Sequence, residues 1–227
     1  MSTSFSYVIL LSASLAALQL KLQGTELLTE ALEVSAQVRS QINQIQGLHC
    51  FGPERAQPGF LALDPLRITV DVSQLGMTGF EAENFLIDRF NLYPELATLR
   101  HVLFLLTPAD DAAAGQRIIK VLREVATNRR VYRPRFVLSP PAIPRQLMLP
   151  RDAFYSRPCR PVPVRAAIGL PSAETIAAFP PGSPIVVAGE EITAEIVDFL
   201  TEIRRHGGVL KGASSPDFTT IRVLANS

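Results

Sequence analysis

The sequence predicts an α/β (or α+β) chain in which a long helix precedes two small units of mixed helix and strand. Apolar residues recur at helical spacing between positions 25 and 45. Residues 57–127 follow the order strand, helix, strand, helix. A stretch rich in proline and arginine at 128–150 then separates this part from a C-terminal segment with its own strands and helix.

The long helix is predicted over Thr25–Ile45. Thr25 is expected to be its N-cap, and Gly47 lies just past its end. Its repeating positions are Leu28, Leu32, Ser35, Val38, Ile42 and Ile45. This spacing is typical of an amphipathic helix with one face on a core.

Strong local signals mark the next elements. Residues 66–72 alternate apolar and polar side chains, which indicates a half-buried strand. Thr78 and Glu81 have the spacing of a capping box, so a helix is expected to begin there and run to Phe90. The glycines at 76 and 79 are therefore interpreted as part of a strand-to-helix turn rather than as a phosphate-binding loop.

The first unit is expected to close with a buried strand at Leu99–Thr107 and a further helix. Asp110 and Asp111 favour the positive N-terminal end of that helix. Its apolar face is formed by Ile118, Ile119, Leu122 and Val125. The linker that follows is expected to be extended, and its arginines are solvated, pack on a partner's acids or bind phosphate.

The C-terminal segment carries its own pattern of strands and a helix. Pro184–Ala188 and Phe218–Leu224 are predicted strands. Between them, Thr193 is expected to cap a helix that ends at Gly207–Gly208. This order predicts a separate small α/β unit.

Composition narrows the function classes. The chain has 227 residues, 47% of them apolar, and a net charge of +1. A core of this size suits a globular protein, and the weak charge argues against nucleic acid or an anionic membrane as a partner. Cys50 and Cys159 lack CxxC spacing and are expected to be reduced thiols in the cytoplasm. The apolar run Tyr7–Leu18 has no preceding Lys or Arg and is shorter than a typical membrane span, which favours neither a signal peptide nor a membrane anchor.

Common catalytic and metal motifs are missing from the sequence. His49, His101 and His206 have no second ligand at metal-binding spacing, so no metal is expected. His101 lies in an apolar strand, where a structural histidine is the expected interpretation. There is no GxSxG elbow, no P-loop and no GxGxxG.

One proline- and glycine-rich segment leaves two interpretations open. The stretch FPPGSPIVVAGEEIT, from Phe179 to Thr193, places a rigid turn before a buried strand and two glutamates after it. Such a turn can form a pocket wall, or it can be purely structural.

Six segments in order resemble the Orn/Lys/Arg decarboxylases, enzymes of aminotransferase-like fold that depend on pyridoxal 5'-phosphate. These are TSFSY, LTEALEVSAQVRSQINQIQGL, DPLRITVDVSQLGMTGFEAENFL, PELATLRHVLFLLTPADD, LPRDAFY and FPPGSPIVVAGEEIT. The chain departs from the family pattern at Phe5, Ser14 and Phe179.

The resemblance implies a division of the chain. Residues 1–46 correspond to an N-terminal loop and linking helix, and 47–128 to the aminotransferase-like small domain. Residues 129–145 are the linker, and 146–227 correspond to the family's C-terminal domain. In the family, a large domain that precedes these parts carries the lysine that binds the cofactor covalently, after a Ser-x-His motif. None of Lys21, Lys120 and Lys211 follows a histidine, and each is expected at the surface.

The resemblance also implies candidate site residues. Hydroxyls of Ser2, Thr3, Ser4 and Ser6 are expected on the phosphate side of the cofactor, or else serve only as a helix N-cap. Pro181, Gly182 and Glu190 are candidates for the substrate pocket. No catalytic residue is assigned to this chain.

Three functional hypotheses follow. The chain is the C-terminal part of a basic amino-acid decarboxylase, inactive alone and completed by a separate chain with the cofactor-binding domain. It is alternatively a non-catalytic, regulatory homologue that docks on an intact decarboxylase, or a degenerate gene product. A homo-oligomer or a complementary chain is the expected partner.

Overall fold

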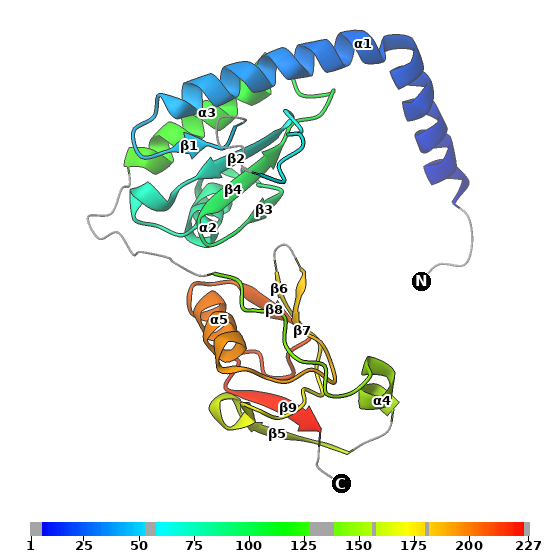
Figure 1. Cartoon of the computed structure of the whole chain (residues 1–227). Helices are drawn as coiled ribbons and strands as arrows, with labels where there is room; N and C mark the ends of the chain where they lie inside the picture. The colour runs from blue at the N-terminus through cyan, green and yellow to red at the C-terminus, as the bar shows by residue number, and fades with distance from the viewer. Residues whose placement is uncertain (1–5, 53–57, 128–138, 156–157, 180–181, 225–227) are drawn as a thin grey trace.

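The computed structural model describes residues 6–52, 58–127, 139–155, 158–179 and 182–224. Two units of mixed helix and strand lie one above the other in Figure 1, and the helix α1 extends sideways from the upper unit. The Pro/Arg-rich segment at 128–138 and residues Ser2 to Ser4 are outside the described part of the chain.

The upper unit contains one four-stranded sheet and three α-helices. The strands lie in the order β1-β2-β4-β3, and every neighbouring pair is antiparallel. Inward-facing residues of the central strands, such as Ile68 and Phe104, join buried residues of all three helices in one core. The elements are α1 (Tyr7–Asn43), β1 (His49–Cys50), β2 (Arg67–Asp71), α2 (Gly79–Phe90), β3 (Leu96–Ala97), β4 (His101–Leu105) and α3 (Ala112–Thr127), with a 3-10 turn at Ser73–Leu75.

The lower unit has two small sheets and a second core. Strands β5 and β9 pair with each other, and β6 lies between β7 and β8. The helix α5 contributes Ile196, Val197 and Leu200 to this core. The elements are α4 (Pro150–Tyr155), β5 (Cys159–Pro163), a 3-10 turn (Val164–Ala167), β6 (Ile176–Phe179), β7 (Pro184–Val186), α5 (Ala194–Arg205), β8 (Val209–Lys211) and β9 (Thr220–Leu224).

The two units also share apolar contacts. Ala178 of β6 and Ile203 of α5 belong to the core of the upper unit. An added Cβ at Gly208, just past α5, would lie 3.3 Å from a ring carbon of Phe80 in α2. Phe80, only 6% exposed, thus packs where the end of α5 meets the upper unit.

Most predicted elements are confirmed, but the predicted start of the long helix is wrong. The helix begins at Tyr7, and Ser6 is its N-cap, with the Ser6 hydroxyl accepting from the Ile9 amide at 3.5 Å. The helix continues through Gly24, so Thr25 is an interior residue whose carbonyl accepts from the Thr29 hydroxyl. A single interior glycine costs only about 1 kcal/mol, which the leucine-rich flanks offset.

The N-terminal part of α1 has no covering element among the described residues. Every residue from Tyr7 to Gln23 is exposed. The helix α1 is long and apolar enough to cross a membrane. A single helix of this kind near the start of a chain is only weak evidence of a membrane span. Its large exposed apolar side chains here are Tyr7, Val8, Ile9, Leu10, Leu11, Leu15, Leu18, Leu20 and Leu22.

The two threonines predicted as caps give a direct test of these assignments. Thr78 forms the predicted capping box: its hydroxyl accepts from the Glu81 amide at 3.0 Å, and the Glu81 carboxylate accepts from the Thr78 amide at 2.8 Å. Thr78→Ala is expected to lower the free energy of unfolding by about 1–2 kcal/mol. Thr25→Ala is expected to raise the free energy of unfolding by about 0.5 kcal/mol, because alanine is the better interior helix residue.

Urea unfolding followed by circular dichroism measures both changes. A loss near 1 kcal/mol for Thr25→Ala would contradict the assignment of Thr25 to the helix interior.

Candidate functional site

The antiparallel register places three titratable side chains in one row across the sheet. His49 of β1 is the partner of Asp71 of β2, and Asp71 is in turn the partner of His101 of β4. Directly opposed residues of neighbouring strands project from the same face of a sheet. The row lies on the face opposite the core, because the residues on either side of Asp71, Val70 and Val72, are fully buried.

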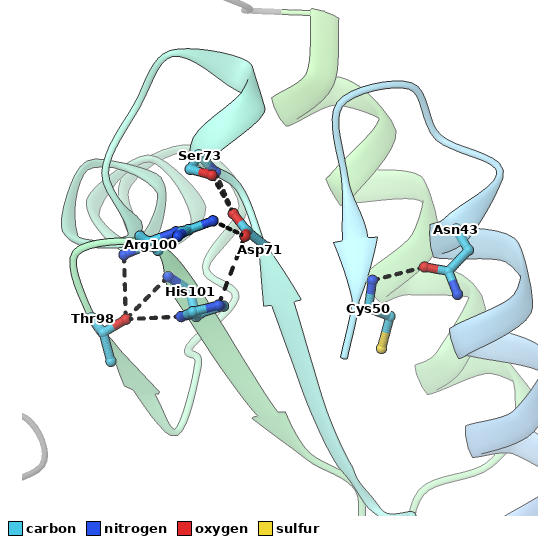
Figure 2. A network of polar contacts seen from close by, with 7 residues as sticks. All are labelled: Asn43, Cys50, Asp71, Ser73, Thr98, Arg100 and His101. Atoms are coloured by element: carbon cyan, nitrogen blue, oxygen red, sulfur yellow. Dashed lines mark hydrogen bonds and ion pairs between the residues drawn. The ribbon is translucent and has the colours of Figure 1, made fainter. Parts of the chain in front are cut away.

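Asp71 is the centre of a polar network (Figure 2). Its Oδ1 accepts from the amide of Ser73 at 2.8 Å and from the Ser73 hydroxyl at 2.5 Å. Its Oδ2 accepts from Nη2 of Arg100 at 2.8 Å and lies 3.9 Å from Nε2 of His101. Burial acts to raise the pKa of Asp71, but the Ser73 hydrogen bonds and the charges of Arg100 and His101 outweigh it, so the pKa lies below its usual value of 3.8.

A tight turn from Thr98 to His101 positions Arg100 and His101, the two basic side chains beside Asp71. The Thr98 hydroxyl accepts from the amides of Arg100 and His101 at 3.3 and 3.1 Å. The Thr98 amide donates to the His101 carbonyl at 2.8 Å. Gly79, the first residue of α2, approaches this turn so closely that an added Cβ would lie 2.2 Å from the His101 carbonyl oxygen. The turn is therefore fixed both by its own hydrogen bonds and by its close contact with Gly79.

His101 has a pKa below its usual value of 6.5. Burial is the main cause, the charge of Arg100 acts in the same direction, and Asp71 opposes both. The imidazole is accordingly neutral at pH 7, and can both donate and accept hydrogen bonds.

These pKa shifts predict lower stability in acid. The unfolded chain takes up a proton at position 101 near pH 6.5, whereas the folded chain does so only at lower pH. The free energy of unfolding is therefore expected to fall as the pH drops below 6.5, and Asp71 adds a further fall below pH 3.8.

Urea titrations between pH 7.5 and 5.5 measure the first effect. His101→Gln removes this titration and is expected to flatten the profile. An equally steep decline in His101→Gln and the unchanged protein would contradict it.

Two cavities meet at the Thr98–His101 turn. The first, of about 560 Å³, is lined by His49, Phe51, Pro58, Phe60, Asp71, Arg100 and His101. The second, of about 390 Å³, lies between the two units and is mostly apolar. It is lined by Phe80, Thr98, Leu99, Arg100, His101, Pro140, Ala178, Ser183, Ile185, Phe199 and Ile203.

The predicted site residues lie in different places. Ser6 is the exposed N-cap of α1, and Ser2, Thr3, Ser4 and Pro181 are outside the described residues. Gly182, before β7, has a φ of +94°, and its amide donates to the Ala178 carbonyl. The next residue, Ser183, lines the second cavity.

Glu190 serves a different turn. Its Oε2 accepts from the Val187 amide at 2.7 Å, and its carbonyl accepts from the Ser172 amide at 2.8 Å. Glu190 lines neither of the two cavities.

The three lysines bear on the cofactor that the resemblance implies. Lys21 on α1, Lys120 on α3 and Lys211 on β8 are all exposed, and none lines either cavity. Nζ of Lys211 lies 3.5 Å from the centre of the Phe179 ring. The described residues thus do not fit a covalent pyridoxal phosphate site.

Metal chemistry also finds no support in the described part of the chain. There, no three His, Cys, Asp or Glu side chains gather closely enough to hold a metal ion, even in the row of His49, Asp71 and His101. Cys50 and Cys159 are not joined by a disulfide bond.

Comparison with known proteins identifies sequence relatives of this chain. No family model matches the chain. It is 33% identical to the arginine decarboxylase of Bacillus subtilis over 227 residues, which cover 98% of this chain and 46% of that protein. The arginine decarboxylase of Halalkalibacterium halodurans is also 33% identical, with the same shares covered. The chain therefore spans about half the length of the curated relatives it matches.

Solved structures show the same fold. The constitutive lysine decarboxylase of E. coli is similar with a TM-score of 0.75 and 19% identity, over 99% of this chain and 44% of that one. The lysine decarboxylase of Francisella novicida has a TM-score of 0.69 and 20% identity, over 89% and 40% of the two chains. The sequence relatives named here are thus arginine decarboxylases, and the chain shares the fold of part of two lysine decarboxylases.

Proposed function

We propose that the chain is the C-terminal part of a pyridoxal-phosphate-dependent decarboxylase of basic amino acids. It is inactive alone and acts when a separate chain supplies the cofactor-binding large domain. The observation that carries the proposal is the coverage: the alignment takes in 98% of this chain but 46% of the B. subtilis arginine decarboxylase. The unmatched part of such a relative is long enough to provide a complete domain.

The surface of α1 supports a docking partner. Nine large apolar side chains between Tyr7 and Leu22 are at least half exposed. Large exposed apolar side chains grouped on one element mark an interaction site. The partner chain that the proposal requires is the occupant we assign to it.

The exposed lysines support the dependence on another chain. Covalent attachment of the cofactor requires a lysine amine inside a shaped site. Since Lys21, Lys120 and Lys211 are all at the surface, the proposal assigns that lysine to the partner. We place the assembly in the cytoplasm, where cysteines that form no disulfide, such as Cys50 and Cys159, stay reduced.

Co-expression tests the proposal. The chain is produced with the half of the B. subtilis arginine decarboxylase that it does not match. We expect the two to co-purify, to show visible absorbance from bound pyridoxal phosphate, and to release carbon dioxide from arginine, lysine or ornithine. The chain alone, with added cofactor, is expected to be colourless and to leave all three amino acids unchanged.

A matched pair of variants tests the docking surface. Leu11→Gln, Leu15→Gln and Leu18→Gln together alter one face of α1 and are expected to lower co-purification at least tenfold. Leu61→Gln and Ile143→Gln alter side chains that are 97% and 94% exposed outside α1, and are expected to leave it unchanged.

Two results would overturn the proposal. The first is turnover by the isolated chain. The second is binding to the intact arginine decarboxylase but not to its unmatched half, which would instead support the non-catalytic, regulatory alternative.

A further inference from the structure

The cavity on the open face of the upper sheet offers more hydrogen-bond donors than acceptors. Asp71 is the one carboxylate among the described residues that line it, and it is already occupied: Ser73 donates twice to Oδ1, and Arg100 donates to Oδ2. A ligand that enters the cavity therefore finds little acceptor capacity on Asp71.

Arg100 keeps donors for a ligand. The pair with Asp71 uses only Nη2, and the Arg100 side chain is about half exposed. Its Nε and Nη1 donate to no described residue. A guanidinium fixed on one side by a carboxylate and open on the other is prepared for a second, planar acceptor such as a carboxylate. His101 also lines the cavity, but its ring nitrogens already lie near Thr98 and Asp71, so Arg100 is the group assigned to the ligand.

The remaining wall consists of His49 and of apolar side chains. The rings of Phe51 and Phe60 meet edge to face with their centres 6.1 Å apart, and Pro58 lies beside them. The volume of about 560 Å³ lies within the range of small-molecule sites. A ligand for this cavity thus needs an acceptor group at one end and an apolar body at the other.

We propose that this cavity binds a small monocarboxylate, with its carboxylate on Arg100 and its apolar body against Phe51 and Phe60. A cationic ligand is disfavoured, because Asp71 already accepts hydrogen bonds from Ser73 and Arg100. A phosphate dianion is disfavoured as well, because the Arg100–Asp71 pair is close to neutral and does not balance two negative charges. The inference stands on these contacts and does not depend on the proposed function.

Calorimetric titration of the full chain with benzoate tests the site. Saturable binding at one site per chain is expected, and benzylamine and inorganic phosphate are expected neither to bind nor to compete. Arg100→Gln is expected to weaken benzoate binding at least tenfold, and Arg100→Lys less. Arg151→Gln is the matched control, because Arg151 is exposed and contacts Asp152 on α4, and it is expected to bind as the unchanged chain does.

A second variant covers the case in which Arg100→Gln fails to fold. Arg100→Gln combined with Asp71→Asn removes both charges of the pair and leaves no unpaired carboxylate, and it is also expected to lose benzoate binding. Phe60→Ala is expected to weaken binding by about three- to tenfold through the lost apolar contact. The proposal is overturned if benzoate does not saturate, if the double variant binds it normally, or if phosphate displaces it.

Discussion

Replacing Gly79 by alanine is expected to lower the free energy of unfolding by about 3 kcal/mol. The added Cβ would lie 2.2 Å from the carbonyl oxygen of His101 and 2.3 Å from that of Thr98. Both obstacles are backbone atoms, and the His101 carbonyl is held by the Thr98 amide at 2.8 Å. Neither can rotate away as a side chain could, so α2 and the Thr98–His101 turn would have to separate.

Gly24 provides the matched control for this substitution. It is also buried, but it lies inside α1, and an added Cβ would meet only Leu20 atoms at 3.8 and 3.9 Å. Gly24→Ala is expected to raise the free energy of unfolding by about 1 kcal/mol through helix propensity. Urea unfolding at pH 7.5 measures both variants. A loss below 1 kcal/mol for Gly79→Ala would show that the turn yields easily.

The effect of Gly79→Ala is expected to reach the cavity as well. Arg100 and His101 belong to the turn that Gly79 contacts, and each of them lines both cavities. A folded fraction of the variant is therefore expected to bind benzoate more weakly than Gly24→Ala does.

Elements with local signals could be predicted from the sequence. The helix α2 has its capping box, α5 its Thr193 cap, and α3 four apolar residues on one face, all as expected. The predicted strand at Leu99–Thr107 is shorter in the structure, since Leu99 and Arg100 belong to the turn before β4.

Elements set by tertiary pairing could not be predicted. The strands β1 and β3 have two residues each, too few for a periodic pattern, and they exist because they pair with β2 and β4. The start of α1 was missed for a different reason. Thr25 after Gly24 has the local pattern of a new helix, while the leucines before it propagate the same helix.

The candidate site follows the same division. The turn around Gly182 was recognisable from its prolines and glycine, and its neighbour Ser183 lines the cavity between the units. In contrast, His49, Asp71 and His101 are far apart in the chain and meet only through the register of three strands. His101 was interpreted as a structural histidine because it lies in an apolar strand, and nothing near it in sequence indicates the aspartate beside it.

Arg39 is expected to be another sensitive position in the upper unit. It reaches from α1 to the chain around the first cavity: Nη1 donates to the Phe51 carbonyl at 2.6 Å, and Nη2 donates to the Pro65 carbonyl at 3.1 Å and to the Arg67 carbonyl. Nε also donates to Pro65, at 3.3 Å. These bonds fix both ends of the segment that carries Phe51 and Phe60.

Arg39→Met is therefore expected to lower the free energy of unfolding by about 2–3 kcal/mol, because three carbonyls lose a charged donor while the aliphatic packing is largely kept. Arg39→Lys is expected to fall in between, since one ammonium cannot span the carbonyls of Phe51, Pro65 and Arg67. Arg123→Met is the control, because its one described bond, to Gln41, is 3.4 Å long, and a change within about 0.5 kcal/mol is expected.

Benzoate affinity separates this role from a purely global one. The aromatic wall depends on the Arg39 contact with Phe51, so Arg39→Met is expected to weaken benzoate binding several-fold even at low temperature, where the variant stays folded. Thr78→Ala, which is expected to cost nearly as much stability through the α2 cap, leaves that wall intact and is expected to bind normally. Equal affinities in the two variants would mean that Arg39 stabilises α1 without shaping the cavity.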